Sequence, residues 1–119
     1  MLPANYNITI LQGKTFKKSF QWKTKNQSGN YEIVNIDGYH IVWKIQPFGS
    51  NAEIIYLQDT GDEPAFTVDT INNKFVLDVT AEKTSQFNFT SGIHQLDIIA
   101  PNGERFCFLT GDIMVRKNL

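Results

Sequence analysis

The chain has 119 residues, a net charge of −1, and 41% hydrophobic and 13% aromatic residues. This length is typical of one domain with one core, and the apolar content excludes a mainly disordered chain. The sequence has no run of about 20 apolar residues, the length that a membrane-spanning helix needs, so we expect no membrane partner. The first seven residues have neither a basic nor a long apolar segment, which predicts a protein made in a cytoplasm without an export signal. The single cysteine, Cys107, excludes an internal disulfide, and we expect it to pack as a small hydrophobe.

The first quarter of the chain predicts two strands and a loop. Residues 7–11 alternate polar and apolar side chains, and residues 12–14 form a turn into a second strand. That second strand is expected to turn three aromatic side chains inward: Phe16, Phe20 and Trp22. The alternation breaks at Lys17 and Lys18, which predicts a β-bulge or a lysine-guarded edge strand. Residues 25–30 are polar and contain glycine, so they are predicted to be a loop.

The clearest core strand follows. Four bulky residues alternate there and share one face of the strand: Tyr39, Ile41, Trp43 and Ile45. Residues 47–51 break the pattern, and short strands are then expected at residues 54–57 and around Phe66 and Val68. Asn72 and Asn73 predict a turn before the next alternating strand, residues 75–79.

A short helix and a hairpin are predicted in the last third. Thr80 is placed to cap one helical turn near residues 81–86. The segment 101–103, Pro-Asn-Gly, then predicts a hairpin turn. We expect three residue pairs across this hairpin, because that register collects the bulky apolar groups on one face: Ala100 with Glu104, Ile98 with Phe106, and Leu96 with Phe108.

These segments sum to about eight short strands with turn signals between them, which predicts an all-β fold, either an antiparallel sandwich or a small barrel. We expect a single β-sandwich domain over residues 1–119, in which residues 1–6 form an N-terminal arm.

Motifs for catalysis, cofactors and metals are not evident. Residues 13–15 read Gly-Lys-Thr, but a phosphate-binding loop needs a glycine where this chain has Ile8. The potential zinc ligands His40, His94 and Cys107 lie on different predicted strands without paired spacing, and we expect His94 to be a hydrogen-bonded core histidine. The acidic turn with Asp59, Asp62 and Glu63 lacks the spacing of a calcium loop. We therefore expect no enzyme, no cofactor and no metal site.

Two binding functions stay open as alternatives. Five lysines surround the first aromatic strand and would suit single-stranded nucleic acid: Lys14, Lys17, Lys18, Lys23 and Lys25. Alternation points the rings of that strand inward, which favours a lysine-protected edge over a nucleic-acid site. A carbohydrate-binding sandwich is the other alternative, with four possible aromatic platforms: Trp22, Tyr39, Trp43 and Tyr56. Alternation buries most of these rings too, and we expect no small-molecule ligand.

Several short motifs resemble a family of small Ig-like virion proteins of tailed bacteriophages, which are associated with the tail and baseplate. The resemblance covers nearly the whole chain and lies in residues Gly13-Lys14-Thr15-Phe16, Ile36-Asp37-Gly38-Tyr39, Trp43-Lys44-Ile45, Phe75-Val76-Leu77, Thr80-Ala81-Glu82-Lys83-Thr84, Gly92-Ile93-His94-Gln95-Leu96-Asp97-Ile98, Pro101-Asn102-Gly103 and Leu109-Thr110-Gly111-Asp112-Ile113.

The resemblance implies an all-β, antiparallel Ig-like β-sandwich that serves particle assembly and not catalysis. The implied function is a tail, baseplate or fibre-attachment adaptor in the virion, and the alternative is a capsid decoration or head-fibre protein. The implied partners are other virion proteins and copies of the chain itself. We expect Pro3, Tyr6, Phe48 and Phe66 to make these contacts, because they lie in the arm or near loops.

Overall fold

The computed structural model describes residues 3–49, 52–61 and 63–117. The fold is all-β with one short helix, as the sequence predicts. Within the described residues the elements are β1 (Ala4–Asn5), β2 (Ile8–Leu11), β3 (Phe16–Phe20), β4 (Lys23–Lys25), β5 (Tyr31–Ile33), β6 (His40–Pro47), β7 (Ile55–Gln58), β8 (Phe66–Asp69), β9 (Lys74–Val79), α1 (Ala81–Ser85), β10 (Ser91–Ile99) and β11 (Arg105–Arg116).

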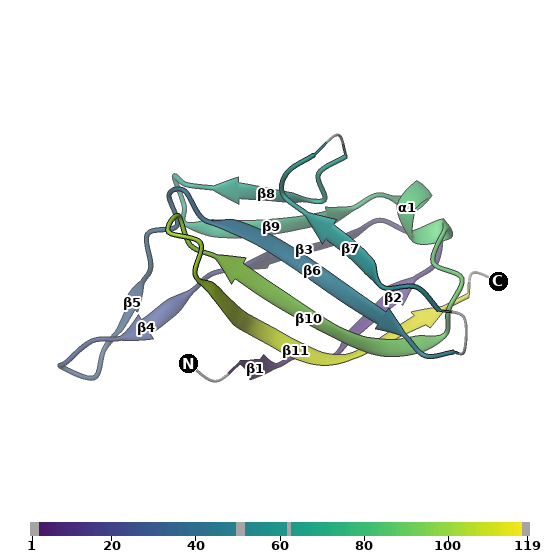
Figure 1. Cartoon of the computed structure of the whole chain (residues 1–119), viewed down its shortest axis with the longest axis horizontal. Helices are drawn as coiled ribbons and strands as arrows, with labels where there is room; N and C mark the ends of the chain where they lie inside the picture. The colour runs from purple at the N-terminus through teal and green to yellow at the C-terminus, as the bar shows by residue number, and fades with distance from the viewer. Residues whose placement is uncertain (1–2, 50–51, 62, 118–119) are drawn as a thin grey trace.

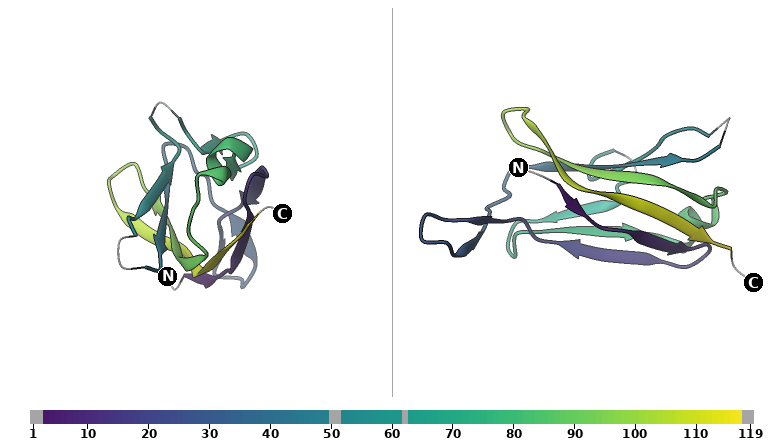
Figure 2. Two further views of the ribbon diagram at one scale, coloured as in Figure 1. Left: turned by 90° about the vertical axis from the view of Figure 1, so that its right-hand side faces the viewer. Right: turned by 90° about the horizontal axis from the view of Figure 1, so that it is seen from below.

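Most strands belong to two sheets. The larger sheet has the order β1-β11-β10-β6-β7. Strand β2 also pairs with β11, at residues that follow those paired with β1. The smaller sheet has the order β3-β9-β8. The two sheets lie one over the other along the long axis of the molecule (Figures 1 and 2), an arrangement that is compatible with a β-sandwich. Both sheets turn apolar side chains toward the space between them, because their strands alternate buried and exposed residues.

One hydrophobic core fills that space. Its largest fully buried side chains come from both sheets and from the segment before β6, namely Trp43, Phe75, Ile10, Ile36, Ile41, Ile45, Leu77, Leu96, Ile98 and Ile113. The predicted inward face of β6 is confirmed, since Ile41, Trp43 and Ile45 have no exposed surface and Tyr39 packs against the core. Trp43 lies between Leu96 on β10 and Leu57 on β7 in the larger sheet.

Two of the described residues of the predicted N-terminal arm form a strand. In β1, Ala4 and Asn5 pair in parallel with Leu109 and Thr110 of β11, and the Tyr6 amide donates to the Thr110 carbonyl at 2.9 Å. Because β2 also runs parallel to β11, the larger sheet is mixed and not purely antiparallel. The prediction of an arm over residues 1–6 is therefore wrong for the described residues, and residues 1 and 2 lie outside them.

The long hairpin β10–β11 confirms most of the predicted register. Ile98 pairs with Phe106, and the Ala100 amide donates to the Glu104 carbonyl at 2.8 Å. Gly103 takes the left-handed conformation that this turn needs, with a φ of 89°. The predicted partner of Leu96 is wrong, because the register shifts there and Leu96 pairs with Leu109. A β-bulge explains this shift, since it inserts one residue into one strand of a pair.

The prediction for the start of the smaller sheet is right in part. Strand β3 is an edge strand, and Phe20 and Trp22 are buried in the core. Strand β3 pairs with β9 without interruption from Phe16 to Phe20, so β3 is an edge strand that has no β-bulge. Lys18 lies on the inward side, and its ammonium is 5.2 Å from the centre of the Tyr6 ring.

The short helix forms where the sequence predicts it. Thr80 is extended at the N-cap, and its side-chain oxygen accepts a hydrogen bond from the Lys83 amide at 3.2 Å. Thr84, fully buried inside α1, joins the helix to the turn after β2 through its hydroxyl. That hydroxyl donates to the Lys14 carbonyl at 2.8 Å and accepts from the Gly13 amide at 3.1 Å. The helix therefore holds the turn that precedes β3.

Strands β4 and β5 form a separate hairpin on either side of the predicted loop, which is confirmed at residues 26–30. All six of their residues are exposed. Figure 1 shows this hairpin extending from one end of the molecule, while α1 lies near the other end. This hairpin and β1 explain why the described residues form more strands than the about eight that the sequence predicts.

Candidate functional site

The outer face of the larger sheet is the strongest candidate for a functional surface. We use "outer face" for the side of β7, β6, β10, β11 and β2 that is turned away from the core. Ile93 of β10 lies near its middle, with Gln46 of β6 on one side and Asp112 of β11 on the other. Two residues further along β6 from Gln46, Lys44 lies beside Tyr56 of β7. These residues point outward because their neighbours in sequence point into the core.

Six large apolar side chains are exposed on or beside this face, each by between 45% and 61%. One of them, Leu11, lies beside Arg116 at the end of β11, and the other five are grouped here. We call them the apolar cluster: Phe48, Ile54, Tyr56, Ile93 and Met114. Two hollows run between them. One, of about 140 Å³, is lined by Ile54 and Ile93, and the other, of about 350 Å³, is lined by Phe48 and Met114. Side chains of this size leave on the order of 400–500 Å² of mostly apolar surface in water, which is typical of an interaction site.

A buried carboxylate lies next to the cluster on the same face. Asp97 is only 3% exposed although it points outward, because neighbouring side chains cover it. Its carboxylate accepts hydrogen bonds from Gln95 Nε2 at 2.8 Å and from Arg105 Nε at 3.2 Å, and Lys44 Nζ lies 3.9 Å away. Two cations thus lie close to one buried anion.

Cys107 is the neighbour of Asp97 on β11. It is half-buried, and its Sγ lies 3.6 Å from the Leu109 carbonyl oxygen. Burial raises the pKa of this thiol, and the charge of Asp97 raises it further. The thiolate is therefore disfavoured, so the environment favours a packing role and not a nucleophile, in line with the expectation from sequence.

His94 lies directly under the outer face, inside the core. It is 2% exposed, Trp43 Nε1 donates to its Nδ1 at 3.0 Å, and its Nε2 lies 2.6 Å from the Tyr6 carbonyl oxygen. Desolvation lowers the pKa of His94, although the Tyr6 carbonyl and Asp112 act in the opposite direction. The prediction of a hydrogen-bonded core histidine is confirmed, since every nitrogen of the ring has a partner.

The four predicted contact residues are not gathered on one surface. Phe48 is exposed and belongs to the apolar cluster, and Pro3 is half-buried. Tyr6 packs against the core with its ring edge-on to Phe20, the ring centres lying 6.3 Å apart. Phe66 is 3% exposed, because its pairing with Leu77 of β9 places both side chains in the core. The prediction that Phe66 contacts a partner is therefore wrong for this structure.

The sequence analysis missed Ile54, Ile93 and Met114, and it considered Tyr56 only as a platform for carbohydrate. A signal for one of them was present, because Ile93 is an apolar residue at an outward position between inward-facing Gly92 and His94. Met114 likewise alternates with the buried Ile113 and Val115. An apolar residue in the polar phase of a strand indicates a surface that something else covers.

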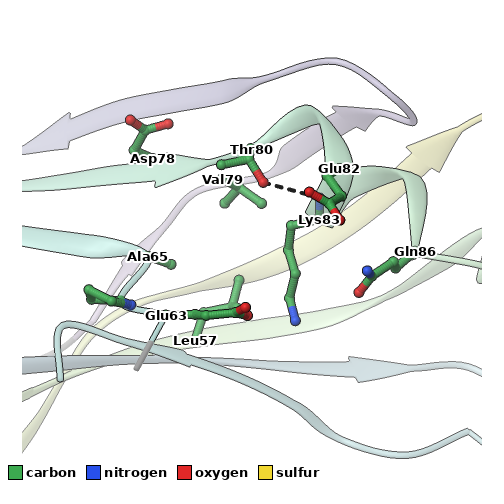
Figure 3. Close-up of a pocket in the computed structure, with 10 residues that line it drawn as sticks. Leu57, Glu63, Ala65, Asp78, Val79, Thr80, Glu82, Lys83 and Gln86 are labelled. Carbon is green, nitrogen blue, oxygen red and sulfur yellow. Dashed lines mark hydrogen bonds between the residues drawn. The ribbon is translucent and has the colours of Figure 1, made fainter. Parts of the chain in front are cut away.

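A pocket of about 350 Å³ lies beside α1, between the edges of the two sheets (Figure 3). Leu57, Ala65 and Val79 supply its apolar wall. Glu63 and Lys83 extend into it from the β7–β8 loop and from α1. Opposite charges thus face the same space, and the pocket shows no single chemical preference.

The residues of the predicted acidic turn do not converge. Asp59 is directed at β6, where its carboxylate lies 2.8 Å from His40 Nδ1 and accepts from the Ile41 amide at 3.1 Å. Glu63 instead lines the pocket beside α1, and Asp62 lies outside the described residues. Over residues 3–49, 52–61 and 63–117, no three His, Cys, Asp or Glu side chains gather closely enough to hold a metal ion.

Most of the aromatic rings considered for ligand binding are buried. Trp43 is fully buried, Trp22 nearly so and Tyr39 packs on the core, which leaves Tyr56 as the exposed ring of that set. The rings between the lysines also point inward, because Phe16 packs on the core and Phe20 is buried. Lys17 is exposed on this edge strand, whereas Lys18 lies on its inward side.

In the described part of the chain, no helix is long and apolar enough to cross a membrane. The chain matches no protein-family model and no curated protein sequence.

Proposed function

We propose that this chain is a structural protein of a bacteriophage virion and that it acts as a tail, baseplate or fibre-attachment adaptor through protein–protein contacts. The observation that carries the proposal is the apolar cluster on the outer face. Isolated apolar residues are normal on protein surfaces, but Ile54 and Ile93 share one hollow and Phe48 and Met114 share the next. Contiguous apolar surface of this extent is typical of contact with another protein.

We further propose that the fold is Ig-like, and the strand order supports this. In an Ig domain of the variable type, strands G, F, C and C′ form one sheet and strands B, E and D belong to the other. The order β11-β10-β6-β7 corresponds to the first and the order β3-β9-β8 to the second. A buried tryptophan on strand C is a hallmark of Ig domains, and Trp43 of β6 is fully buried.

The assignment to a bacteriophage rests on the sequence motifs. The residues that carry the resemblance hold structural positions here, which include the core residue Trp43, the N-cap Thr80 and the turn glycines Gly38 and Gly103 with positive φ. A shared set of core, cap and turn residues supports a shared architecture, and an adaptor needs no further chemistry than an exposed binding face.

The proposal is tested on the particle itself. Virions of a phage that encodes this chain are purified by density gradient, and their proteins are quantified by mass spectrometry. We expect the chain to be present at a fixed copy number per particle. Immunogold labelling then places it on the tail or on the head, and a head position selects the capsid decoration alternative. Absence of the chain from intact virions would contradict the proposed function.

A further inference from the structure

We infer that a second copy of this chain covers the outer face in a two-fold symmetric dimer. The two-fold axis runs parallel to β10, midway between the two facing sheets. The inference rests on the proposed function, because it names one partner for the same surface. It is carried by two features of the outer face, which are the size of the apolar cluster and the placement of one cation and one anion on either side of Ile93.

The size of the apolar cluster suits a dimer interface of ordinary dimensions. Such an interface buries about 800 Å² on each partner, and about 65% of that area is apolar in homodimers, which gives about 500 Å². The five side chains of the apolar cluster leave a similar apolar area exposed in the single chain. They also lie on a regular sheet, and two sheets pack face to face at a separation of about 10 Å.

The outer face carries charges of both signs, placed so that two copies of the face bring opposite charges near one another. Lys44 lies on β6 and Asp112 lies on β11, which are the two neighbours of β10. A two-fold axis along β10 exchanges the two sides of the face, so β6 of each copy lies over β11 of the other. Lys44 of each copy then lies over β11 of the other copy, level with Thr110 and two residues along that strand from Asp112. An isologous interface requires this kind of self-complementary arrangement.

Both charged groups are free to take part. The Lys44 side chain is 37% exposed and its ammonium is 3.9 Å from Asp97, whose carboxylate is already bound more closely by Arg105 and Gln95. Asp112 is exposed, and its bond to Asn7 uses its backbone amide, which donates to Asn7 Oδ1. Ile93, midway between the two strands, then lies near Ile93 of the second copy, because residues close to a two-fold axis meet their own counterparts.

Sedimentation of the purified chain tests the dimer. We expect a monomer–dimer equilibrium in the micromolar range, and we expect Ile93→Lys to raise the dissociation constant by at least about tenfold, since it places two cations at the axis. Asp112→Lys should also weaken the dimer, because it places a like charge two residues from the position of Lys44 of the other copy. The matched control is Ile71→Lys, which makes the same change at a residue that is 90% exposed in the β8–β9 turn. This control should dimerise like the wild type.

A cross-link tests the position of the axis. In a Cys107→Ala background, Ile93→Cys should be cross-linked to a dimer by a bismaleimide that spans the about 10 Å between the two sheets, whereas Ile71→Cys should not. A wild-type chain that stays monomeric at high concentration would overturn the inference, and so would an Ile93→Cys variant that does not cross-link. Neither result affects the proposed function, which falls only if virions lack the chain.

Discussion

The indole nitrogen of Trp43 donates a hydrogen bond to Nδ1 of His94 at 3.0 Å, inside the core. This bond determines the tautomer of the histidine, because an Nδ1 that accepts carries no proton and the ring proton then lies on Nε2. The Nε2–H group donates to the carbonyl of Tyr6, just after β1. One neutral imidazole thus joins strands β6 and β10 to the N-terminal strand pair, and its protonation would break the link to Trp43.

This link makes stability depend on pH. Burial lowers the pKa of His94 in the folded chain below its ordinary value of 6.5. The unfolded chain therefore binds a proton first as the pH falls, so stability is complete above pH 6.5 and decreases below it. We expect the urea concentration at the midpoint of unfolding to decrease as the pH is lowered from about 7.5 to about 5.5.

A histidine variant identifies the group responsible. His94→Gln should flatten the pH dependence, because it removes the buried ring whose pKa is lowered. An NMR titration of the imidazole signals should place the pKa of His94 below 6.5. A stability that rises with acidification over this range would contradict the assigned tautomer.

The two tryptophans should respond differently to the same substitution. Trp43→Phe leaves the His94 Nδ1 atom without its donor and opens space in the core, which should cost about 3 kcal/mol. Trp22→Phe should cost about 1 kcal/mol less, because among the described residues the buried Trp22 Nε1 has no hydrogen-bond partner to lose. Equilibrium unfolding of both variants checks the order, and equal losses would contradict the role given to the indole donor.

Gly111 of β11 leaves room for Tyr6 and Asn7, the residues that connect β1 to β2. A Cβ atom at this position would meet the carbonyl oxygen of Tyr6, would lie 2.7 Å from the Tyr6 carbonyl carbon and would lie 3.0 Å from Asn7 Oδ1. We expect Gly111→Ala to destabilise the fold by about 2 kcal/mol and to expose the N-terminal segment to proteolysis. Arg116→Ala, an exposed change on the same strand, should stay within about 0.5 kcal/mol of the wild type. An unaffected Gly111→Ala variant would show that β1 does not pack as described.

The hydroxyl of Thr84 should hold the turn before β3. Thr84→Val keeps the volume but removes the bonds to the Gly13 amide and the Lys14 carbonyl, and we expect a loss of about 2 kcal/mol. Thr84→Ser keeps the hydroxyl and should lose about 1 kcal/mol through its missing methyl group. Hydrogen exchange at the Gly13 amide should accelerate in the valine variant and not in the serine variant. Equal acceleration in both variants would assign the effect to packing instead.

The sequence predicts the strands whose side chains alternate between core and surface. Residues 8–11, 40–47 and 74–79 show this alternation because one face of each strand is buried, and all three regions are strands. Thr80 also predicts its own helix, because a capping side chain acts on amides only two or three residues away. Such local signals do not depend on the rest of the chain.

The missed features depend on contacts that are distant in sequence or on backbone alone. Strand β1 pairs through its backbone with residues more than a hundred positions away, and Ala4 and Asn5 are both exposed. Strands β4 and β5 bury no side chain, so they leave no alternating pattern. The apolar cluster combines loop residue Phe48 with Met114 at the far end of the chain, and only the sheet order brings them to one surface.

Incorporation into virions tests most directly whether the outer face carries the function. Phage that express Ile93→Lys or Ile71→Lys in place of the wild-type chain are purified, and the copy number of the chain per particle is measured by mass spectrometry. Both substitutions replace an exposed isoleucine by lysine, but only Ile93 lies on the outer face. We predict that Ile71→Lys particles contain the normal copy number and that Ile93→Lys particles lose most of it. Equal incorporation of the two variants would contradict the account.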